Sequence, residues 1–438
     1  PVPDLGLIVI DEEHEWTYKQ EAAQPLYDAR TAALELARLT GAVVVMGSAT
    51  PDVETYYQAS TGQASTGQAG RGRTRLLELP DRIGSPQEVK MEGQKSALAQ
   101  VTICDMREEL RDGNRNIFSQ ELSKGLKECI YTNHQAILFL NRRGSAPFVQ
   151  CRDCGYVLTC RSCTVTLTFH STIARLVCHR CNLRTRMPRR CRQCGGERIR
   201  QLGIGTQRVV AEVTGLLPGI RVERWDADSS RSGNVPEQTM AGLASGEIQV
   251  LVGTQMVAKG LDLPNVTLVG AVLADVGLHL PDFRAGERAF SLLCQVAGRA
   301  GRGPDPGRVI IQTYNPEHYA VAAAATQDYS AMYRLEIQTR QAQGNPPFNQ
   351  LAQIRFQDLS ATACQRQATA LARLLRQRVA ARGLSDVEIA GPAPGIPERI
   401  RGHYRWNLLV RGRNLHRFLE DVRLPPEVVV DVDPAHLL

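Results

Sequence analysis

Four polar residues follow the first apolar run of the chain, and their types could bind a metal–nucleotide complex. The run Leu7–Ile10 is typical of a β-strand, and Asp11, Glu12, Glu13 and His14 come directly after it. Many nucleotide hydrolases use carboxylates at the end of a buried strand to hold Mg²⁺ and to position a water molecule. We therefore expect ATP and Mg²⁺ to bind at this strand end.

Such enzymes also need a glycine-rich loop with a lysine that binds the phosphates, and this loop normally precedes the acidic strand. The chain contains no Gly-Lys pair, and only six residues precede Leu7. We expect the loop to lie upstream of Pro1, so that this sequence is a C-terminal fragment of a longer protein and is inactive alone. The sheet around Leu7 would then lack strands and expose an unpaired edge and apolar surface.

Eight of the twelve cysteines form four C-x-x-C pairs. Two such turns supply the four thiolates of one structural Zn²⁺ site, so four turns predict two sites. Fourteen residues separate the second and third turns, close to zinc-ribbon spacing, whereas only five separate the first and second. This spacing favours nested pairing. The inner site would use Cys160, Cys163, Cys178 and Cys181, and the outer site Cys151, Cys154, Cys191 and Cys194.

Two other interpretations of the cysteines are less favoured. A disulfide framework needs an oxidising compartment, and no charged-then-apolar secretory segment opens the chain. His170 and His179 lie near the turns and are candidate ligands, but eight thiolates already fill two tetrahedral sites.

The net charge of +7 and the pI of about 8.9 favour a polyanionic partner. Most of the positive charge is arginine, and arginines crowd around the third and fourth cysteine turns, with Arg189 and Arg190 adjacent. Arginine suits bidentate phosphate contacts, so we expect DNA binding there. A solvated charged face is the alternative. No apolar run is long enough to span a membrane.

Two kinds of fold are expected to position these candidate site residues. Apolar strand-like runs alternate with helical periodicity over most of the chain, as in an α/β fold with a parallel sheet. One predicted helix, residues 28–40, ends at Gly41. The cysteine-rich stretch interrupts a second α/β region, so we expect it to be an insertion.

After Pro346 and Pro347 the pattern changes to strand, long helix, two strands, short helix and strand. This is the β-α-β-β-α-β order of a ferredoxin-like α+β domain. The stretch "APGIPERIRGHY", residues 393–404, is predicted to be a Pro/Gly/Arg loop between the two middle strands, and Glu398–Arg405 is predicted to be a second DNA contact.

The motifs "DEEH", "GSAT", "GTQMVAKGLD" and "QVAGRAGR" occur in the order found in superfamily 2 helicases, whose two RecA-like lobes clamp ATP. With "DEEHEWTYKQ", "FLNRRGSAPFVQCRDCGY" and "GPAPGIPERIRGHYRWNLL", the chain resembles the primosomal protein N′ family of bacterial replication-restart DNA helicases over essentially its whole length. The resemblance implies the nested zinc pairing and a 3′→5′ helicase that recognises abandoned forks and starts primosome assembly.

The resemblance also implies roles for single residues. Asp11 would hold Mg²⁺, Glu12 would orient the attacking water, and His14 would belong to the same catalytic set. Arg299 and Arg302 would act as arginine fingers on the transferring phosphoryl group, with Gln295 and Gly298 beside the nucleotide. Aromatic residues can stack on bases. The other expected DNA contacts are Trp16, Tyr18, Thr254 and Lys259.

The expected partners are forked and single-stranded DNA, single-stranded-DNA-binding protein and primosome assembly proteins, in the cytoplasm at the nucleoid. The alternative function is a non-hydrolysing, zinc-dependent scaffold that binds fork DNA. The expected domains are the C-terminal part of helicase lobe 1 (1–60), a flexible linker (61–72), the first part of lobe 2 (73–150), a zinc-binding insertion (151–199), the second part of lobe 2 (200–318) and a C-terminal domain (319–438).

Overall fold

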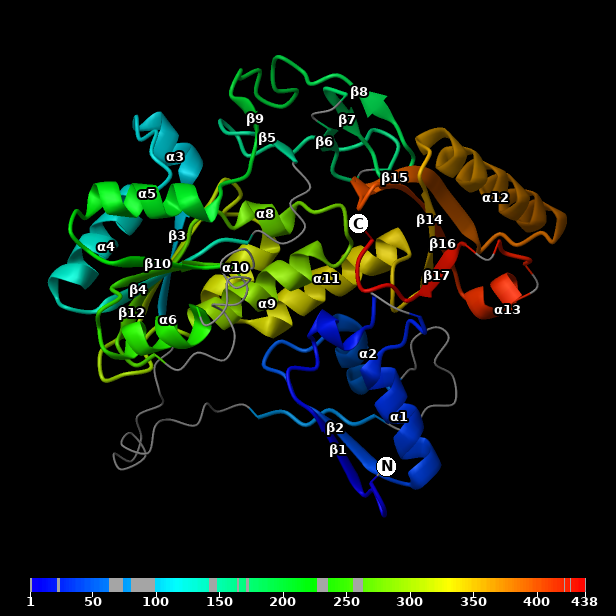
Figure 1. The fold of residues 1–438 in the computed structure, drawn as a ribbon, viewed down its shortest axis with the longest axis horizontal. Coiled ribbons are helices and arrows are strands. Elements are labelled where there is room, and N and C mark those ends of the chain that lie inside the picture. Colours follow the sequence, from blue (N-terminus) through cyan, green and yellow to red (C-terminus); the bar gives the residue numbers. More distant parts are fainter. Residues whose placement is uncertain are drawn as a thin grey trace.

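The computed structural model describes residues 2–21, 24–62, 74–79, 99–141, 148–163, 165–170, 173–226, 235–254, 263–420, 422–425 and 427–437. Four regions can be followed in Figure 1: a small N-terminal unit, a large parallel sheet with its helices, a cysteine-rich module, and a C-terminal antiparallel sheet. The predicted linker at 61–72 lies almost wholly outside the described residues. No helix in the described part of the chain is long and apolar enough to cross a membrane.

The N-terminal unit contains two parallel strands, with each residue of Leu7–Ile10 (β1) paired to a residue of Val43–Met46 (β2). Between them runs α1 (Ala29–Thr40). Its N-cap, Asp28, accepts two backbone N–H groups, and it ends where Gly41 adopts φ 77°, the left-handed conformation that glycine favours at a helix end. Leu7, Val9 and Val43 are each more than half exposed, so the strands present the apolar surface that the sequence predicts.

The large sheet is a RecA-like parallel sheet with strand order β10-β11-β4-β12-β13-β3. Its strands are β3 (Gln100–Asp105), β4 (Gln135–Phe139), β10 (Val222–Trp225), β11 (Val250–Gly253), β12 (Val266–Ala271) and β13 (Arg308–Thr313). All five residues of β4 are buried because both faces of the sheet are covered. Ile137 and Phe139 face one core, and Ala136 and Leu138 face the other.

Helices cover both faces of this sheet (Figure 1). They are α3 (Met106–Arg111), α4 (Gln120–Tyr131), α5 (Thr206–Leu216), α6 (Val235–Ala244), α8 (Asp275–Leu278), α9 (Ala285–Ala297), α10 (Tyr319–Thr326) and α11 (Tyr329–Gln343). Sequence reasoning did not identify β3, which forms the edge beside β13.

The cysteine-rich module is built from short antiparallel strands. They are β5 (Val149–Cys151), β6 (Thr168–His170), β7 (Arg175–Val177), β8 (Arg184–Thr185) and β9 (Ile199–Gln201). Because β5 pairs with β9, the chain enters and leaves the module through one two-stranded ribbon. The geometry is that of an insertion between β4 and α5.

The C-terminal sheet has the order β15-β16-β14-β17 with antiparallel neighbours, which is the ferredoxin-like arrangement predicted from the element order. Its elements are β14 (Gln350–Asp358), α12 (Ala361–Ala381), β15 (Glu388–Ile400), β16 (His403–Gly412), α13 (Leu415–Glu420) and β17 (Val429–Val432).

The predicted loop at 393–404 is wrong. β15 continues to Ile400 and pairs with β16, so that only a tight turn at Arg401 and Gly402 joins the two strands. The register shifts twice along this pair, between Ala390 and Ala393 and between Pro394 and Arg399. Such irregularities accommodate the prolines within a strand at the sheet edge.

Helix α2 (Val53–Thr61) joins the N-terminal unit to the large sheet. Val53 is fully buried in the core that covers the large sheet, and its backbone N–H donates to Glu287 Oε1 at 2.6 Å. The other oxygen of Glu287 lies 2.6 Å from Arg340 Nη2, and Arg340 Nε donates to Glu336 at 2.8 Å. Arg340 is only 1% exposed, so this ion pair network is buried where the two parts meet.

Replacing Arg340 by Ala should lower the free energy of unfolding by about 3–5 kcal/mol, because it leaves two buried carboxylates without their counter-ion. Arg334→Ala on the same helix is the matched control. Its side chain is exposed, so the change should stay within about 0.5 kcal/mol. Urea unfolding followed by circular dichroism measures both, and equal shifts would contradict a structural role for the network.

Candidate nucleotide site and metal centres

The acidic motif lies at the carboxyl end of β1, as expected for parallel strands. Asp11 and Glu12 are exposed there, and Glu12 adopts φ 48° with its N–H donating to Asp11 Oδ1 at 2.9 Å. The turn is closed on the neighbouring strand, because Gly47 N donates to Ile10 O and Glu13 N donates to Gly47 O. Both carboxylates therefore lie at one strand end, where Glu12 Oε2 is also 3.5 Å from His14 Nδ1 and its side chain is about half exposed.

His14 connects three sequence motifs. Its Nε2 accepts from the Gln295 side-chain amide at 2.7 Å, and its Nδ1 lies 2.7 Å from Ser48 Oγ. With Nε2 accepting, the proton sits on Nδ1 and is donated to Ser48, an assignment that follows from the hydrogen-bond network. The structure thus brings together the acidic motif, the "GSAT" segment after β2 and helix α9 of the large sheet.

Glu13 is a residue that sequence reasoning did not assign. It is 1% exposed, and its two oxygens accept from Asp52 N at 2.6 Å and Thr55 Oγ1 at 3.2 Å. Burial, with the nearby charge of Asp52, raises the pKa of Glu13 to about 7. No local pattern reveals this role, since both partners lie about forty positions along the chain.

The candidate arginine fingers follow α9. Arg299 is half-buried just after the helix, and Arg302 is exposed with its Nε donating to Gly298 O at 3.1 Å. Gln295 reaches the acidic motif through His14, whereas the contact of the two arginines with a nucleotide stays a prediction.

The predicted DNA contacts Trp16 and Tyr18 lie in one short turn. Tyr18 donates its hydroxyl to Asp11 O at 2.7 Å, so the aromatic loop, residues 16–19, is tied to the acidic motif. The Trp16 ring lies 4.8 Å from the ring of His436, measured between centroids. Thr254 is half-buried directly after β11, and Lys259 lies outside the described residues.

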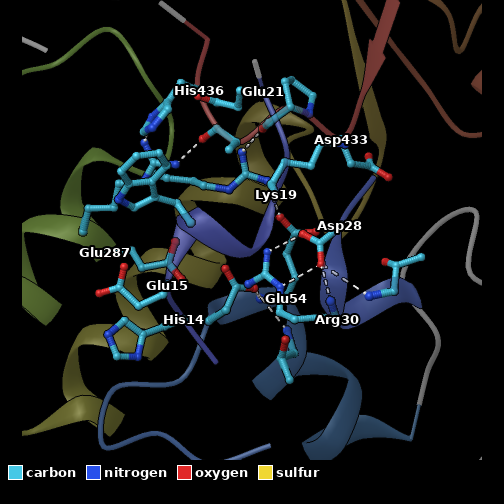
Figure 2. A pocket seen from close by; sticks show the side chains of 18 of the residues that line it. His14, Glu15, Lys19, Glu21, Asp28, Arg30, Glu54, Glu287, Asp433 and His436 are labelled. Carbon is cyan, nitrogen blue, oxygen red and sulfur yellow. Dashed lines mark hydrogen bonds and ion pairs between the residues drawn. The ribbon is translucent and has the colours of Figure 1, made fainter. Parts of the chain in front are cut away.

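A cavity of about 910 Å³ lies beside the aromatic loop. Figure 2 shows its charged lining, with Lys19, Asp433 and His436 toward one side and Asp28 and Arg30 toward another. The lining comes from the N-terminal unit, from α9 and from the C-terminal sheet. Three parts of the fold therefore meet around it.

The eight C-x-x-C cysteines form two groups, and within each group the sulfurs lie within 4.8 Å of one another. This grouping is the nested pairing that the spacing favours. One group is Cys160, Cys163, Cys178 and Cys181, and the other is Cys151, Cys154, Cys191 and Cys194. Neither group includes His170 or His179, whose Nε2 atoms lie 2.9 Å apart.

The geometry of the two groups fits Zn²⁺. A tetrahedral ion with Zn–S bonds of about 2.3 Å separates its sulfurs by about 3.8 Å, and three cross-turn Sγ–Sγ distances are 3.6–3.7 Å. Each turn is closed by a backbone bond from its first cysteine to the carbonyl five residues later. In three turns the residue after the second cysteine is left-handed: Gly155, Asn182 and Gly195.

The module is docked on the end of β13. Gly155 packs so tightly on this strand end that a Cβ would lie 2.3 Å from Tyr314 O. Arg152 Nε donates to the Tyr314 hydroxyl at 2.8 Å. Fully buried Asp275 accepts from Tyr314 N and from Gln150 Nε2, which joins the entry strand β5 to the large sheet.

A second set of contacts joins the module to the C-terminal sheet. His179 Nδ1 donates to Pro394 O at 2.7 Å, and Arg180 pairs with Glu388 at 2.9 Å. Burial lowers the pKa of His179 to about 4, so this imidazole is neutral at pH 7. The module therefore bridges two sheets.

Gly155→Ala and Gly195→Ala make a matched pair, because both residues have φ near +75° and follow the second cysteine of a turn. Gly195→Ala should cost about 1 kcal/mol for the left-handed conformation alone, since nothing lies within 4 Å of the added Cβ. Gly155→Ala should cost about 3 kcal/mol or more, because the Cβ also meets Tyr314 O. Denaturant unfolding, with hydrogen exchange at Tyr314, distinguishes them. Equal costs would show that the docking contact is unimportant.

Two family models match parts of the chain: "Primosomal protein N C-terminal domain" at residues 341–435 and "Helicase conserved C-terminal domain" at residues 205–304. A yeast solved structure, Dbp5 bound to RNA and ADP BeF3, is 14% identical with a TM-score of 0.36, covering 77% of this chain and 63% of its own. At that score the likeness adds nothing to the fold described above.

Relatives resemble the chain along nearly all of its length. "Replication restart protein PriA" of Bacillus subtilis is 42% identical, covering 94% of this chain and 48% of the relative. The PriA proteins of a Synechocystis species and Treponema pallidum are 39% and 38% identical, covering 99% and 100% of this chain and 51% and 63% of the relatives. The chain spans about half the length of the first two. With both domain models and the two cysteine groups in agreement, the chain belongs to the PriA replication restart protein family.

Proposed function

We propose that this chain provides much of the helicase core of an ATP-dependent 3′→5′ DNA helicase, which recognises stalled or abandoned replication forks and initiates primosome assembly. The observation that carries the proposal is the position of His14. Its hydrogen bonds to Ser48 and Gln295 link the loop that bears Asp11 and Glu12 to helix α9. A rearrangement at the acidic motif would therefore reach helix α9 through His14.

The proposed roles follow from position. Asp11 would hold Mg²⁺, which stabilises charge on the phosphates, and Glu12 would orient the attacking water, since both carboxylates are exposed at the strand end. Arg299 and Arg302 follow α9, whose Gln295 contacts His14, and they would stabilise charge on the transferring phosphoryl group, with Gln295 and Gly298 beside the nucleotide.

The alternative function is a zinc-dependent scaffold that binds fork DNA without hydrolysing ATP. The sequence feature that favours it is the absence of any Gly-Lys pair, and hence of a phosphate-binding loop, within these 438 residues. The His14 network favours the helicase, because a scaffold has no need to connect an acidic motif to α9.

DNA binding would use the cysteine-rich module and the β15–β16 hairpin. Arg189, Arg190 and Arg200 line an open pocket of about 780 Å³ whose wall also includes Met187 and Ile199. Arg190 pairs with exposed Glu197, an interaction that water and salt weaken. Fork structures and single-stranded DNA are the proposed ligands. Single-stranded-DNA-binding protein and primosome assembly proteins are the proposed partners, and the cytoplasm, at the nucleoid, is the proposed location.

The test uses a longer form of the protein that includes a phosphate-binding loop. DNA-stimulated ATP hydrolysis is expected in that form and absent from the 438-residue chain. Glu12→Gln should lower kcat by at least about a hundredfold, because it removes the group that orients the water. Glu35→Gln is the control, since this exposed residue of α1 pairs with Arg38 of the same helix. A long form that binds forked DNA but does not hydrolyse ATP would establish the scaffold instead.

We propose that the two cysteine groups hold two Zn²⁺ ions per chain, because the sulfurs lie at tetrahedral separations. Cys178→Ser should reduce the metal content to about one ion per chain, since the outer group keeps its four thiolates. The control is Cys129→Ser, which changes a buried cysteine of α4 outside both groups. Elemental analysis after exhaustive dialysis measures the content. A single ion in the unmodified chain, or two in Cys178→Ser, would refute this assignment.

A further inference from the structure

The segment that follows β17, residues 433–437, leaves the C-terminal sheet and runs across to the other parts of the fold. Asp433 adopts φ 50°, an uncommon conformation for a residue other than glycine, and its N–H donates to Leu351 O at 2.8 Å. The chain turns at this point, and Pro434, Ala435 and His436 line the cavity of Figure 2.

Helix α9 and the loop before it hold this segment. Arg284 donates to Pro434 O at 3.1 Å, and Arg288 donates to Ala435 O. Leu437 N donates to Asp282, whose carboxylate is fully buried and also pairs with Arg288. Successive backbone groups of the segment are thus bound by charged side chains, so its path is specified.

The same segment and the end of β17 hold the aromatic loop. Lys19 Nζ donates to Val432 O at 2.8 Å and pairs with Asp431 at 3.2 Å, and both side chains are almost fully buried. Trp16 packs on His436 with the ring planes tilted by 55°. His436 is in turn fixed by Arg288, 2.7 Å from its Nδ1. The aromatic loop is therefore docked on α9 through the segment.

We propose that residues 433–437 form a strap that holds the aromatic loop in a docked position, with His436 engaging the Trp16 ring that single-stranded DNA would otherwise stack on. The strap positions the loop, and DNA competes with it for Trp16. The DNA part of this proposal rests on the proposed function. Because Tyr18 donates to Asp11 O, release of the loop by DNA would reach the acidic motif directly.

The expected size of the effect follows from the contact. An aromatic pair of this kind changes an equilibrium constant by roughly two- to tenfold, and stacking of a base on an aromatic ring is of similar or greater strength. Removing the His436 ring should therefore shift Trp16 toward a position exposed to solvent, while the buried Lys19–Asp431 pair still anchors the end of the loop.

The first measurement needs no DNA and no ATP. Trp225 and Trp406 are 7% and 3% exposed, so acrylamide quenching of the fluorescence reports mainly on half-buried Trp16. His436→Ala should raise the quenching constant about twofold or more. His134→Ala, at a partly exposed histidine that contacts Asp305 and does not line this cavity, is the matched control and should leave quenching unchanged. Trp16→Phe should remove the difference between the variants. Equal quenching in His436→Ala and in the unmodified chain would overturn the strap.

The second measurement adds an oligothymidylate to the same variants. His436→Ala should bind it roughly two- to tenfold more tightly than the unmodified chain. The gain should disappear when Trp16→Ala is present in both chains, because alanine cannot stack on a base. Weaker binding by His436→Ala would overturn the competition, because the ring would then belong to the DNA site. If quenching changes as expected but no variant binds the oligonucleotide, the strap stands and the proposed DNA function fails.

Discussion

Carboxylates from three segments converge on the N-terminus of α2, and the arrangement of the molecule depends on how their charges are compensated. Glu13 of the acidic motif accepts from Asp52 N, Asp52 caps its own helix, and Glu287 of α9 accepts from Val53 N. The first N–H groups of a helix have no partner within the helix, and together with the helix dipole they stabilise negative charge here. Burial nevertheless raises the pKa of both Glu13 and Glu287 to about 7.

Arginines complete the compensation and in doing so connect the parts of the fold. Arg30 of α1 donates to Glu13 O, Arg284 pairs with Glu54, and Arg340 of α11 pairs with Glu287. A buried ion pair adds little net stability over an apolar packing, but loss of one partner is costly. The network therefore fixes how α2 sits on α9, and with it the position from which Gln295 reaches His14.

Polar contacts also connect the cysteine-rich module and the C-terminal sheet to the rest of the molecule. The module contacts the large sheet through Asp275 and Gly155, and the C-terminal sheet through His179 and Arg180. Residues 433–437 then return from the C-terminal sheet to α9 and the aromatic loop. The cysteine-rich module is thus joined to both sheets, and the aromatic loop is joined to the acidic motif through Tyr18 and Asp11.

The sequence by itself determined the features that depend on near neighbours. Each C-x-x-C turn brings two thiolates together, and the longer gap between the second and third turns predicts the nested groups. Helix α12 runs from Ala361 to Ala381 as its periodicity predicts. Gly41 ends α1 as predicted, because a helix end depends on the conformation of one residue and its local backbone hydrogen bond. The order of strands and helices was likewise sufficient for the ferredoxin-like sheet.

Only the tertiary structure decided which side chains are buried together. Glu13 looks like its exposed neighbours in sequence, and it is buried because α2 folds back onto the end of β1. The extension of β15 to Ile400 overrides the turn signals of its prolines because β16 supplies a partner strand. The contact of Trp16 with His436 joins opposite ends of the chain. Such contacts are set by packing between distant segments, which local patterns of residue type do not encode.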